Sequence, residues 1–366
     1  MARSKTSLPK RELLQLAKDY KPDMGIGGWV VSEKLDGIRM FWDGGVTRGL
    51  PIHEVPFANV LKQDRFIQDH VATGLWSRYG HPIFPPDWWI DRLPNFMLDG
   101  EVWLGRQMWQ QTSSIVRTLP EKRVDCNWFD MRFKVFDTPP LTSIMQVGEI
   151  NNTNYVKIIT PDIASWFLKR TVDTKARVIS KRQFASQLCF LEQFLPTNET
   201  VHLHEQFILP PNELQAKDVL RTKFESWVAL GAEGAIVRAP QSDWVPIRNP
   251  LMLKVKQVND AEATVIGYTA AEYGETGAKL GLIGALQCTY MGRPFKIGTG
   301  FNDVERAFGD EESIRWAKRC PGEDAPPFVS SKLFPRGSTI TFKYSEFTQD
   351  GIPKEARYNR KFHGTH

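Results

Sequence analysis

Apolar residues alternate with polar ones along several short segments, and this period of two predicts β-strands. In the first two thirds of the chain the pattern occurs in "VVSEKLDGIRMFWDGGVTRG", "NFMLDGEVWLG", "RFKVFDTPP", "GAEGAIVRAP" and "LMLKVKQ". Within the first of these, Asp43, Gly44 and Gly45 favour a turn. We therefore predict two strands joined there, so that Lys34 and Arg48 flank one hairpin.

Apolar residues at helical spacing predict helices in residues 181–194, 212–230 and 59–71. The short segment "KRELLQLAKDY" is also predicted to be helical, because Leu13, Leu14, Leu16 and Ala17 fall on one side of a helix. Residues 82–97 are rich in proline and tryptophan, which predicts a structured loop or insertion. We expect Trp88 and Trp89 in this segment to pack inside the protein.

Beyond residue 257 the pattern changes to short β runs separated by glycine. These runs are "DAEATVIGY", "GLIGALQCTY", "RPFKIGTGF" and "STITFKYSEF", with one helical stretch in residues 302–318. Such spacing is typical of a small β-barrel. We predict an α+β protein in which residues 1–257 form antiparallel sheets with packed helices and residues 258–366 form a barrel.

Composition fits an ordered intracellular protein. The chain has 366 residues, of which 41% are hydrophobic and 24% charged, so it can bury a large core in one or two domains. A net charge of +5 permits binding to polyanions without requiring it. The four cysteines lie far apart with no C-x-x-C pair, which argues against a zinc ribbon or a disulfide scaffold. The amino terminus lacks the apolar run of a secretory signal, and we expect no membrane insertion.

Lys34 lies in "SEKLDGIR", a K-x-D-G pattern that is weak alone, because a lysine next to a turn is usually a solvated surface charge. Five further stretches follow it in a fixed order: "TRG" (47–49), "LDGE" (98–101), "VFDTP" (135–139), "EGAIVR" (233–238) and "LKVK" (253–256). This ordered set resembles the ATP-dependent DNA ligases of the covalent nucleotidyltransferase superfamily, in their compact viral or bacterial form. The resemblance extends from about residue 29 to residue 360.

Phosphoryl transfer to an amine is helped by positive charges and a carboxylate close to that amine. An amine that attacks a phosphorus atom must be neutral, and nearby positive charge lowers its pKa. Lys254 and Lys256 point to the same face of a strand, where they could bind one triphosphate, although a surface strand with alternating lysines is the simpler interpretation. Glu233 precedes a glycine, and its carboxylate could hold Mg²⁺, although a glutamate and glycine pair is most often a turn.

The resemblance implies an adenylation (nucleotidyltransferase, ATP-grasp-like) domain followed by an OB-fold barrel, with the active site between the sheets and facing the barrel across a cleft. It makes Lys34 the nucleophile that accepts AMP. Roles in catalysis or cofactor binding are implied as follows: Asp36 in nick sealing, Lys254 and Lys256 on the triphosphate, Glu33 with the cofactor, Arg39 on the sugar, Arg48 on the nick 5′-phosphate, Glu101 on the ribose or a metal-bound water, Phe136 on adenine, and Glu233 on the metal.

The last motif, "EFTQDGIPKEARYNRK", is similar to the family segment that orients the ATP pyrophosphate. Lys354, Arg357 and Arg360 are the candidates for this contact. The family usually has a proline-arginine pair after the glycine, whereas this chain has Pro353 followed by Lys354. A solvated basic tail that contacts DNA or only water is an equal alternative.

The resemblance implies a monomeric cytoplasmic enzyme, from a bacterium or an infected host cell, that seals nicked duplex DNA in replication, repair or recombination. Its cofactors would be ATP and Mg²⁺, for which Mn²⁺ can substitute. NAD-dependent ligases carry a cysteine zinc finger that four scattered cysteines cannot supply. Three alternatives remain: an RNA ligase and a GTP-dependent mRNA capping nucleotidyltransferase, over which "FKIGTGF" favours a DNA ligase, and a catalytically silent nucleic-acid clamp, against which the intact lysines and glutamates argue.

Overall fold

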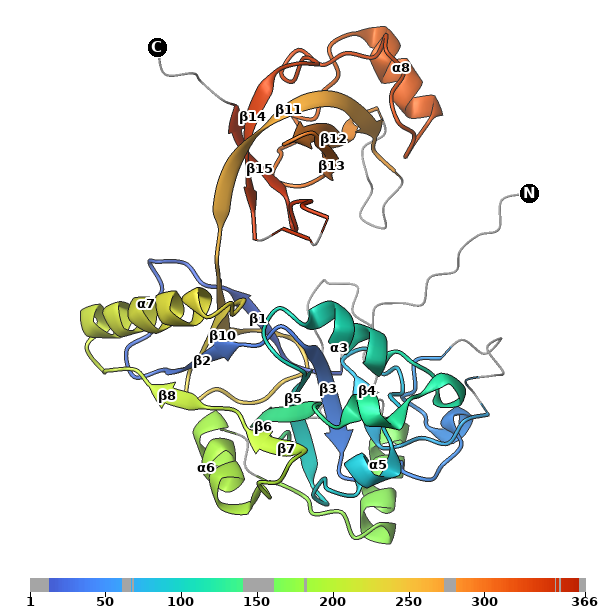
Figure 1. Ribbon diagram of the computed structural model, residues 1–366, viewed down its shortest axis with the longest axis vertical. Coiled ribbons are helices and arrows are strands. Elements are labelled where there is room, and N and C mark those ends of the chain that lie inside the picture. The colour runs from blue at the N-terminus through green and yellow to red at the C-terminus, as the bar shows by residue number, and fades with distance from the viewer. Residues whose placement is uncertain are drawn as a thin grey trace. The chain divides into compact units, whose positions relative to one another are not determined.

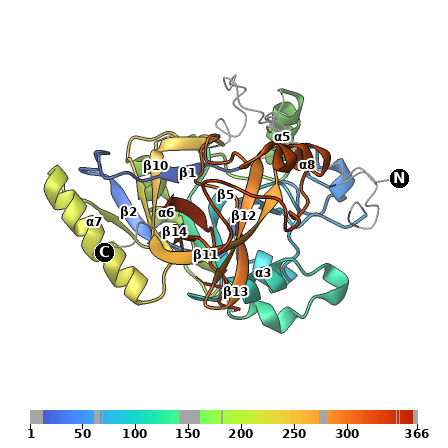
Figure 2. The ribbon, with the colours of Figure 1, turned by 90° about the horizontal axis from the view of Figure 1, so that it is seen from above.

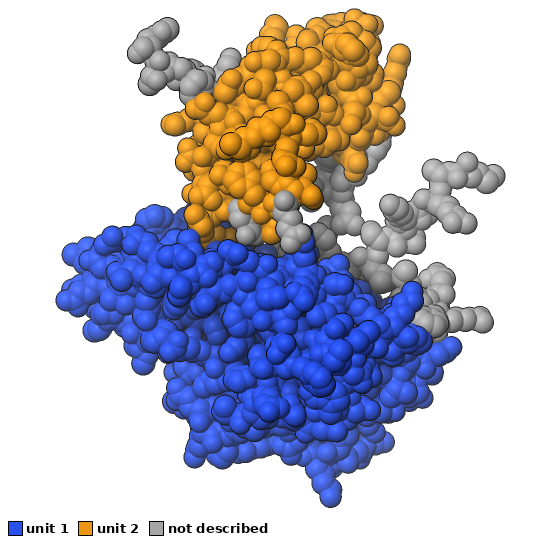
Figure 3. Space-filling model, in the orientation of Figure 1, with its two compact units in different colours: residues 1–255 blue, residues 256–366 orange. Residues whose placement is uncertain are grey.

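The computed structural model describes residues 13–60, 67, 69–140, 161–180, 183–272, 281–345, 347–348 and 350–361. The chain divides into two compact units, Met1–Val255 and Lys256–His366, which Figure 3 shows in blue and orange. The predicted domain boundary near residue 257 lies two residues from this division. None of the helices that the structure describes is both long and apolar enough to cross a lipid bilayer.

The first sheet of unit 1 has the strand order β1-β10-β9-β2-β8. Its strands are Leu16–Asp19 (β1), Val30–Lys34 (β2), Gln206–Ile208 (β8), Gly234–Arg238 (β9) and Arg248–Lys256 (β10). Helix α7, Glu213–Ala229, packs on β2 and β9 (Figures 1 and 2). Val31, Leu220 and Val237 form part of the buried core between helix and sheet. The pairing of β1 with β10 is parallel, so this sheet is not purely antiparallel.

The second sheet of unit 1 has the strand order β4-β3-β5-β6-β7. Its strands are Ile38–Asp43 (β3), Leu75–Ser77 (β4), Met97–Trp103 (β5), Arg132–Asp137 (β6) and Val201–Leu203 (β7), of which only β6 and β7 pair in parallel. Met40, Leu98 and Phe133 form a buried face. Because side chains alternate along a strand, the opposite face carries Arg39 and Glu101, which face each other across β3 and β5.

The other helices of unit 1 lie in the connections between strands. They are the 3-10 helices Ile52–Glu54 (η1), Pro120–Lys122 (η2) and Asp125–Trp128 (η3) and the α-helices Asp87–Ile90 (α2), Trp109–Val116 (α3), Pro161–Asp173 (α5) and Phe184–Phe194 (α6). Helices α6 and α7 confirm the predictions for residues 181–194 and 212–230. Most of the helix predicted for residues 59–71 lies outside the described residues. Trp89 of α2 is fully buried and Trp88 packs beside it, as predicted.

Two predictions near the amino terminus are wrong. Residues 16–19 form strand β1 instead of a helix, because they pair with β10, more than 200 positions away in the chain. The predicted hairpin does not form, because residues 44–50, which follow β3, form turns and bends and no second strand. In addition, β2 belongs to the first sheet and β3 to the second. The chain crosses between the sheets at residues 35–37. The turn at Asp43 ends β3 and leads into further turns, so Arg48 lies in a loop and not on a strand.

A buried ion pair joins the two sheets of unit 1. Arg238 of β9 binds the carboxylate of Asp137 of β6, and both side chains are almost completely buried. Burial raises the pKa of Asp137, and the charge of Arg238 offsets part of this rise. Gln15 extends the network by accepting a hydrogen bond from Nη2 of Arg238 at 3.3 Å. Removal of one partner from such a pair leaves the other charge buried and typically costs about 3 to 5 kcal/mol.

Unit 2 is a curved five-stranded sheet with the order β13-β12-β11-β14-β15 (Figure 1). Its elements are Asn259–Ala270 (β11), Ile283–Tyr290 (β12), Arg293–Ile297 (β13), Glu311–Arg319 (α8), Thr339–Tyr344 (β14) and Arg357–Lys361 (β15). The strand pairs are antiparallel. Strands β13 and β15 are the two edges of this sheet. Among the described residues, a single isolated bridge between Thr299, just after β13, and Arg357 of β15 links the two edges, so the strands do not close a full barrel.

The α+β class is confirmed. The helix predicted for residues 302–318 begins only at residue 311, because Asp310 is its N-cap and accepts a hydrogen bond from the backbone N–H of Ser313 at 2.8 Å.

Candidate active site

Lys34 is the last residue of β2, next to the point where the chain leaves the first sheet. The register of β2 with β9 places Lys34 opposite Gly234, so Glu233 lies directly beside it. The Lys34 ammonium donates a short hydrogen bond to Oε2 of Glu233. Both side chains are about one-fifth exposed, 21% for Lys34 and 18% for Glu233, so the pair is partly shielded but open to a ligand. Strand pairing therefore brings together two residues that are 199 positions apart.

Glu101 completes a group of two carboxylates around this lysine. Its Oε1 accepts a hydrogen bond from the backbone N–H of Gly37 at 2.8 Å. A β-carbon at position 37 would lie 2.5 Å from the carbonyl oxygen of Val102, so only glycine fits here. Burial raises the pKa of Glu101, the charges of Lys34 and Arg39 lower it, and the charge of Glu233 raises it again. The hydrogen bond from Gly37 ties Glu101 to the crossing that follows directly after Lys34.

Arg39 and Phe136 lie beside this group on the same sheet. The Arg39 guanidinium lies over the Phe136 ring, 4.4 Å from its centroid. It also binds Asp99 through two hydrogen bonds of 2.6 and 2.8 Å. Asp99 in turn accepts a hydrogen bond from the indole N–H of Trp244 at 3.2 Å. Arg39 is thus held rigidly against the ring that the family resemblance assigns to adenine.

Glu33 points to the opposite side of β2 from Lys34, because adjacent strand residues alternate. Arg106 donates hydrogen bonds of 2.8 and 2.7 Å to its two carboxylate oxygens. The Glu33 carbonyl oxygen lies 2.8 Å from Nε2 of His204. Burial lowers the pKa of His204, which favours the neutral ring. The Glu33 carboxylate is therefore paired with Arg106. Asp36, the other acid of this motif, is half-buried where the chain crosses between the sheets.

Lys254 and Lys256 both lie on β10, two positions apart. The Lys254 ammonium lies 3.2 Å from a carboxylate oxygen of Asp19 on β1. Lys256, the first residue of unit 2, lies 3.0 Å from both carboxylate oxygens of Glu355. Each of the two predicted triphosphate ligands thus has a carboxylate partner that a phosphate would have to replace.

The three basic residues of the last motif lie in unit 2. Arg357 and Arg360 lie on β15 with exposed side chains, and Lys354 lies in the turn before this strand. Their predicted contact with pyrophosphate stays a prediction.

Arg48 lies in a loop that a buried carboxylate organises. Asp43, fully buried, accepts hydrogen bonds from the Thr47 hydroxyl at 2.6 Å, the Gly45 N–H at 3.0 Å and the Trp76 indole at 3.1 Å. The three donors fix the turn between β3 and Arg48.

The buried carboxyl of Asp43 predicts a pH dependence of stability. Burial raises its pKa to about 6, even though Thr47 and Trp76 donate hydrogen bonds that lower it. The pKa of an unfolded aspartate is about 4, so between about pH 4 and pH 6 the native state holds a proton on Asp43 that the unfolded state has lost. The stability contributed by this proton is complete below about pH 4 and is lost as the pH rises through 6. We expect the free-energy difference in unfolding between the wild type and Asp43→Asn to fall by roughly 3 kcal/mol over this range.

Urea titrations at pH 4, 5, 6 and 7 measure this difference. The matched control is Asp218→Asn on α7, where the carboxylate is exposed. A wild-type-minus-variant difference that stays constant across the range contradicts the assignment.

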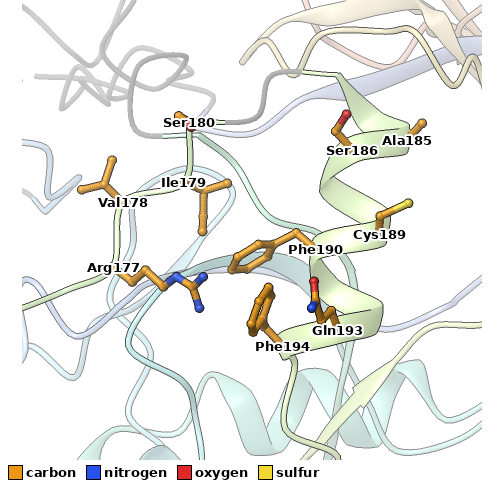
Figure 4. A pocket seen from close by; sticks show the side chains of 10 residues that line it. All are labelled: Arg177, Val178, Ile179, Ser180, Ala185, Ser186, Cys189, Phe190, Gln193 and Phe194. Atoms are coloured by element: carbon orange, nitrogen blue, oxygen red, sulfur yellow. The ribbon is translucent and has the colours of Figure 1, made fainter.

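A separate groove lies between residues 177–180 and helix α6 (Figure 4). Its volume is about 540 Å³, and Arg177 lies in it over the rings of Phe190 and Phe194, 4.7 and 4.3 Å from their centroids. None of the predicted site residues lines this groove, so it is distinct from the group around Lys34.

Comparison with known proteins shows which enzymes the chain resembles. A model described as "DNA ligase OB-like domain" matches residues 276–361, in unit 2. A Haemophilus influenzae protein named "DNA ligase" is 27% identical over 336 residues, which cover 92% of this chain and 87% of that protein. A solved structure from a study of Lig E DNA ligases, described as having a minimal scaffold, is 28% identical with a TM-score of 0.61, covering 95% of this chain and 98% of that one. The chain is thus similar to DNA ligases over most of its length.

A further solved structure, "Pmar-Lig_Pre.", is 18% identical with a TM-score of 0.57, covering 96% of this chain and 68% of that one. It supports the fold of this ligase. The recognition from ordered motifs is thus confirmed at the level of family and enzyme class.

Several residues around the candidate site were missed by sequence reasoning. Asp99 binds Arg39, and Asp137 and Arg238 form the buried ion pair between the sheets. Each of the three lies inside a motif that was recognised for another residue. Their alternation with apolar positions was visible in "MLDGE" and "VFDTP". Asp91, the partner of Arg48 at 2.6 Å, gave no such pattern, because it lies in the segment rich in proline and tryptophan.

Proposed function

We propose that this DNA ligase seals nicks between a 5′-phosphate and a 3′-hydroxyl in duplex DNA, with ATP as the source of AMP. The observation that carries the proposal is the contact of Lys34 with Glu233, with Glu101 beside both. A lysine at this place is a nucleophile once it is neutral. The hydrogen bond to Glu233 must therefore be released, and the proton lost, before the amine can react.

In the first transfer the Lys34 amine attacks the α-phosphorus of ATP, the bond to pyrophosphate breaks, and a lysyl-adenylate forms. In the second, an oxygen of the nick 5′-phosphate attacks the same phosphorus, and the bond to Lys34 breaks. In the third, the 3′-hydroxyl attacks the DNA phosphorus and AMP leaves. All three are in-line phosphoryl transfers, for which positioning and charge neutralisation provide most of the catalysis.

The surrounding residues have roles that fit their positions. Phe136 offers a ring for adenine, and Arg39, which is fixed by Asp99 and lies over one face of this ring, is the candidate contact for the sugar. Lys254 and Lys256 supply positive charge for the triphosphate. Arg48 binds the nick 5′-phosphate, for which a planar guanidinium is suited. In unit 2, Lys354, Arg357 and Arg360 remain the candidates for pyrophosphate or DNA.

The residues present fit a divalent cation such as Mg²⁺. Glu101 and Glu233 offer hard carboxylate oxygens, which Mg²⁺ prefers. Among the described residues there is no group of three or more His, Cys, Asp or Glu side chains that could hold a metal ion. A cation bound by two carboxylates has further coordination positions for phosphate oxygens and water. A cation held there would neutralise charge on the reacting phosphates.

The DNA contacts of such an enzyme are mainly to phosphates, because sealing needs no base readout, and binding falls as salt increases. We further propose that the enzyme acts in the cytoplasm, where ATP is supplied. It would act as a monomer, since one chain carries every residue of the site.

The experiment that tests the function offers nicked duplexes with DNA or RNA on the 3′-hydroxyl side, each with ATP or GTP and Mg²⁺. We expect sealing of the all-DNA nick with ATP. Sealing restricted to the RNA-containing nick would instead indicate an RNA ligase, and covalent labelling by GTP alone a capping enzyme. Binding of DNA without labelling or sealing would indicate a silent clamp.

A further inference from the structure

The ion pair between Arg48 and Asp91 connects the predicted phosphate ligand to the segment rich in proline and tryptophan. Nη2 of Arg48 donates a hydrogen bond to Oδ1 of Asp91 at 2.6 Å. A second carboxylate, that of Asp87, lies 3.6 Å from the same nitrogen. Asp87 and Asp91 are four positions apart, one helical turn, and so face the same way. A single nitrogen of the guanidinium is thus flanked by two negative charges.

Both partners of this ion pair are held in place by buried residues. On one side, the turn before Arg48 is fixed by the buried carboxylate of Asp43. On the other side, helix α2 is anchored by Trp89, which is fully buried and donates a hydrogen bond from its indole N–H to the Met131 carbonyl at 3.1 Å. The contact between Asp91 and Arg48 is therefore determined by the buried residues that hold the turn and helix α2.

The charged ends of the two side chains are nevertheless open to solvent. The Arg48 side chain is 36% exposed and that of Asp91 59%. No hydrogen bond to any other nitrogen of the Arg48 guanidinium is present among the described residues. A phosphate that binds with two parallel hydrogen bonds would need Nη2 together with one of these nitrogens. Asp91 already accepts from one of the two N–H groups of Nη2, and its negative charge beside that nitrogen would repel a phosphate, so the phosphate and Asp91 would compete for the guanidinium.

We propose that Arg48 exchanges partners, leaving Asp91 for the 5′-phosphate of the nick and returning to Asp91 when the strand is sealed. The proposal rests on the function proposed above and assigns Asp91 as a positioning residue that acts through Arg48. A terminal phosphate carries a charge of about −1.5 to −2 at neutral pH, and it displaces a carboxylate of charge −1 that is only weakly held at the surface. A sealed phosphodiester carries a single charge, so Asp91 competes better with the product than with the substrate.

The test measures equilibrium binding of nicked duplexes to the full chain, by fluorescence anisotropy at low salt. The protein is first incubated with pyrophosphate to reverse any adenylation, and the assay omits ATP and metal so that no transfer occurs. One duplex carries a 5′-phosphate at the nick and the other a 5′-hydroxyl. We expect Asp91→Asn to bind the 5′-phosphate nick about two- to fivefold more tightly, the range that an exposed ion pair allows, with less than a twofold change for the 5′-hydroxyl nick.

Two controls isolate the role of Arg48. Asp87→Asn removes the more distant carboxylate of the same helix, and we expect a smaller effect than that of Asp91→Asn. In the background of Arg48→Ala, Asp91→Asn should have no effect on either duplex. Thermal melting of each variant checks that α2 remains folded.

Three results would overturn the partner exchange: equal tightening for both duplexes, weaker binding of the 5′-phosphate nick by Asp91→Asn, or an effect that persists without Arg48. The first would indicate a general charge effect and the second an orienting role. If Arg48→Ala leaves the preference for a 5′-phosphate unchanged, the proposed role of Arg48 itself fails. A chain that seals no nick in the sealing experiment described above rejects the proposed function instead, whereas the binding experiment without ATP tests only the partner exchange.

Discussion

Replacement of Lys34 by alanine is expected to abolish covalent labelling of the chain with AMP. Wild-type protein incubated with ATP labelled at the α-phosphate and Mg²⁺ should carry the label through denaturing electrophoresis. Since Lys34 would supply the only bond between protein and AMP, we expect a loss of roughly a thousandfold or more. Lys34 occupies the end of β2 and is partly exposed, so its truncation should leave the fold intact.

Two variants sharpen this test. Lys34→Arg keeps the positive charge but offers no neutral amine, because arginine stays protonated, so it should also remain unlabelled. Lys169→Ala removes an exposed lysine on α5 and should be labelled like the wild type. Undiminished labelling of Lys34→Ala would disprove the covalent mechanism at this residue.

Replacement of Glu233 by alanine is expected to reduce nick sealing by about a hundredfold or more. Its carboxylate holds the Lys34 ammonium and is one of two oxygen ligands that could bind a divalent cation, so the variant loses both contacts. Single-turnover sealing of a nicked duplex measures the effect, and circular dichroism checks the fold. Because Glu233 precedes β9 and is partly exposed, we expect a folded protein.

The matched controls separate charge from shape. Glu233→Gln keeps the size and removes the charge, and it should resemble Glu233→Ala if the carboxylate acts through its charge. Glu192→Ala removes an exposed glutamate from α6 and should seal normally. Sealing by Glu233→Ala at the wild-type rate would exclude Glu233 from the reaction site.

The sequence predicted the strands and helices whose pattern is local. The alternation in "RFKVFDTPP" identified β6, and the apolar spacing of residues 212–230 identified α7, where Asn212 caps the helix. Strand β1 was mistaken for a helix, because a short apolar run fits both periods and the pairing with β10 decides between them. The predicted hairpin was also wrong: Gly44 and Gly45 do form a turn, but residues 46–50 after it form bends and turns in place of a second strand.

The candidate site was predictable where one residue type performs the chemistry. Lys34 and Glu233 were chosen because the ordered motifs resemble those of ATP-dependent DNA ligases, in which an amine and a carboxylate have roles in phosphoryl transfer. The structure places the two side chains in contact. The partners Arg106 and Asp91 were out of reach, since an arginine or aspartate in a loop has many possible contacts. Which acid lies beside which base depends on long-range pairing that a single sequence does not encode in any local pattern.

The crossing of the chain at residues 35–37 makes the site a seam between two sheets. Lys34 and Glu233 belong to the first sheet, whereas Glu101 belongs to the second. The spacing of the three groups therefore depends on how firmly the sheets are joined, and Arg238 and Asp137 join them at a buried point away from solvent. Substitutions of Arg238 or Asp137 are expected to lower activity by changing the spacing of the site, although every reacting side chain is still present. The tolerance of the enzyme to mutation is therefore set partly by residues that never touch its substrates.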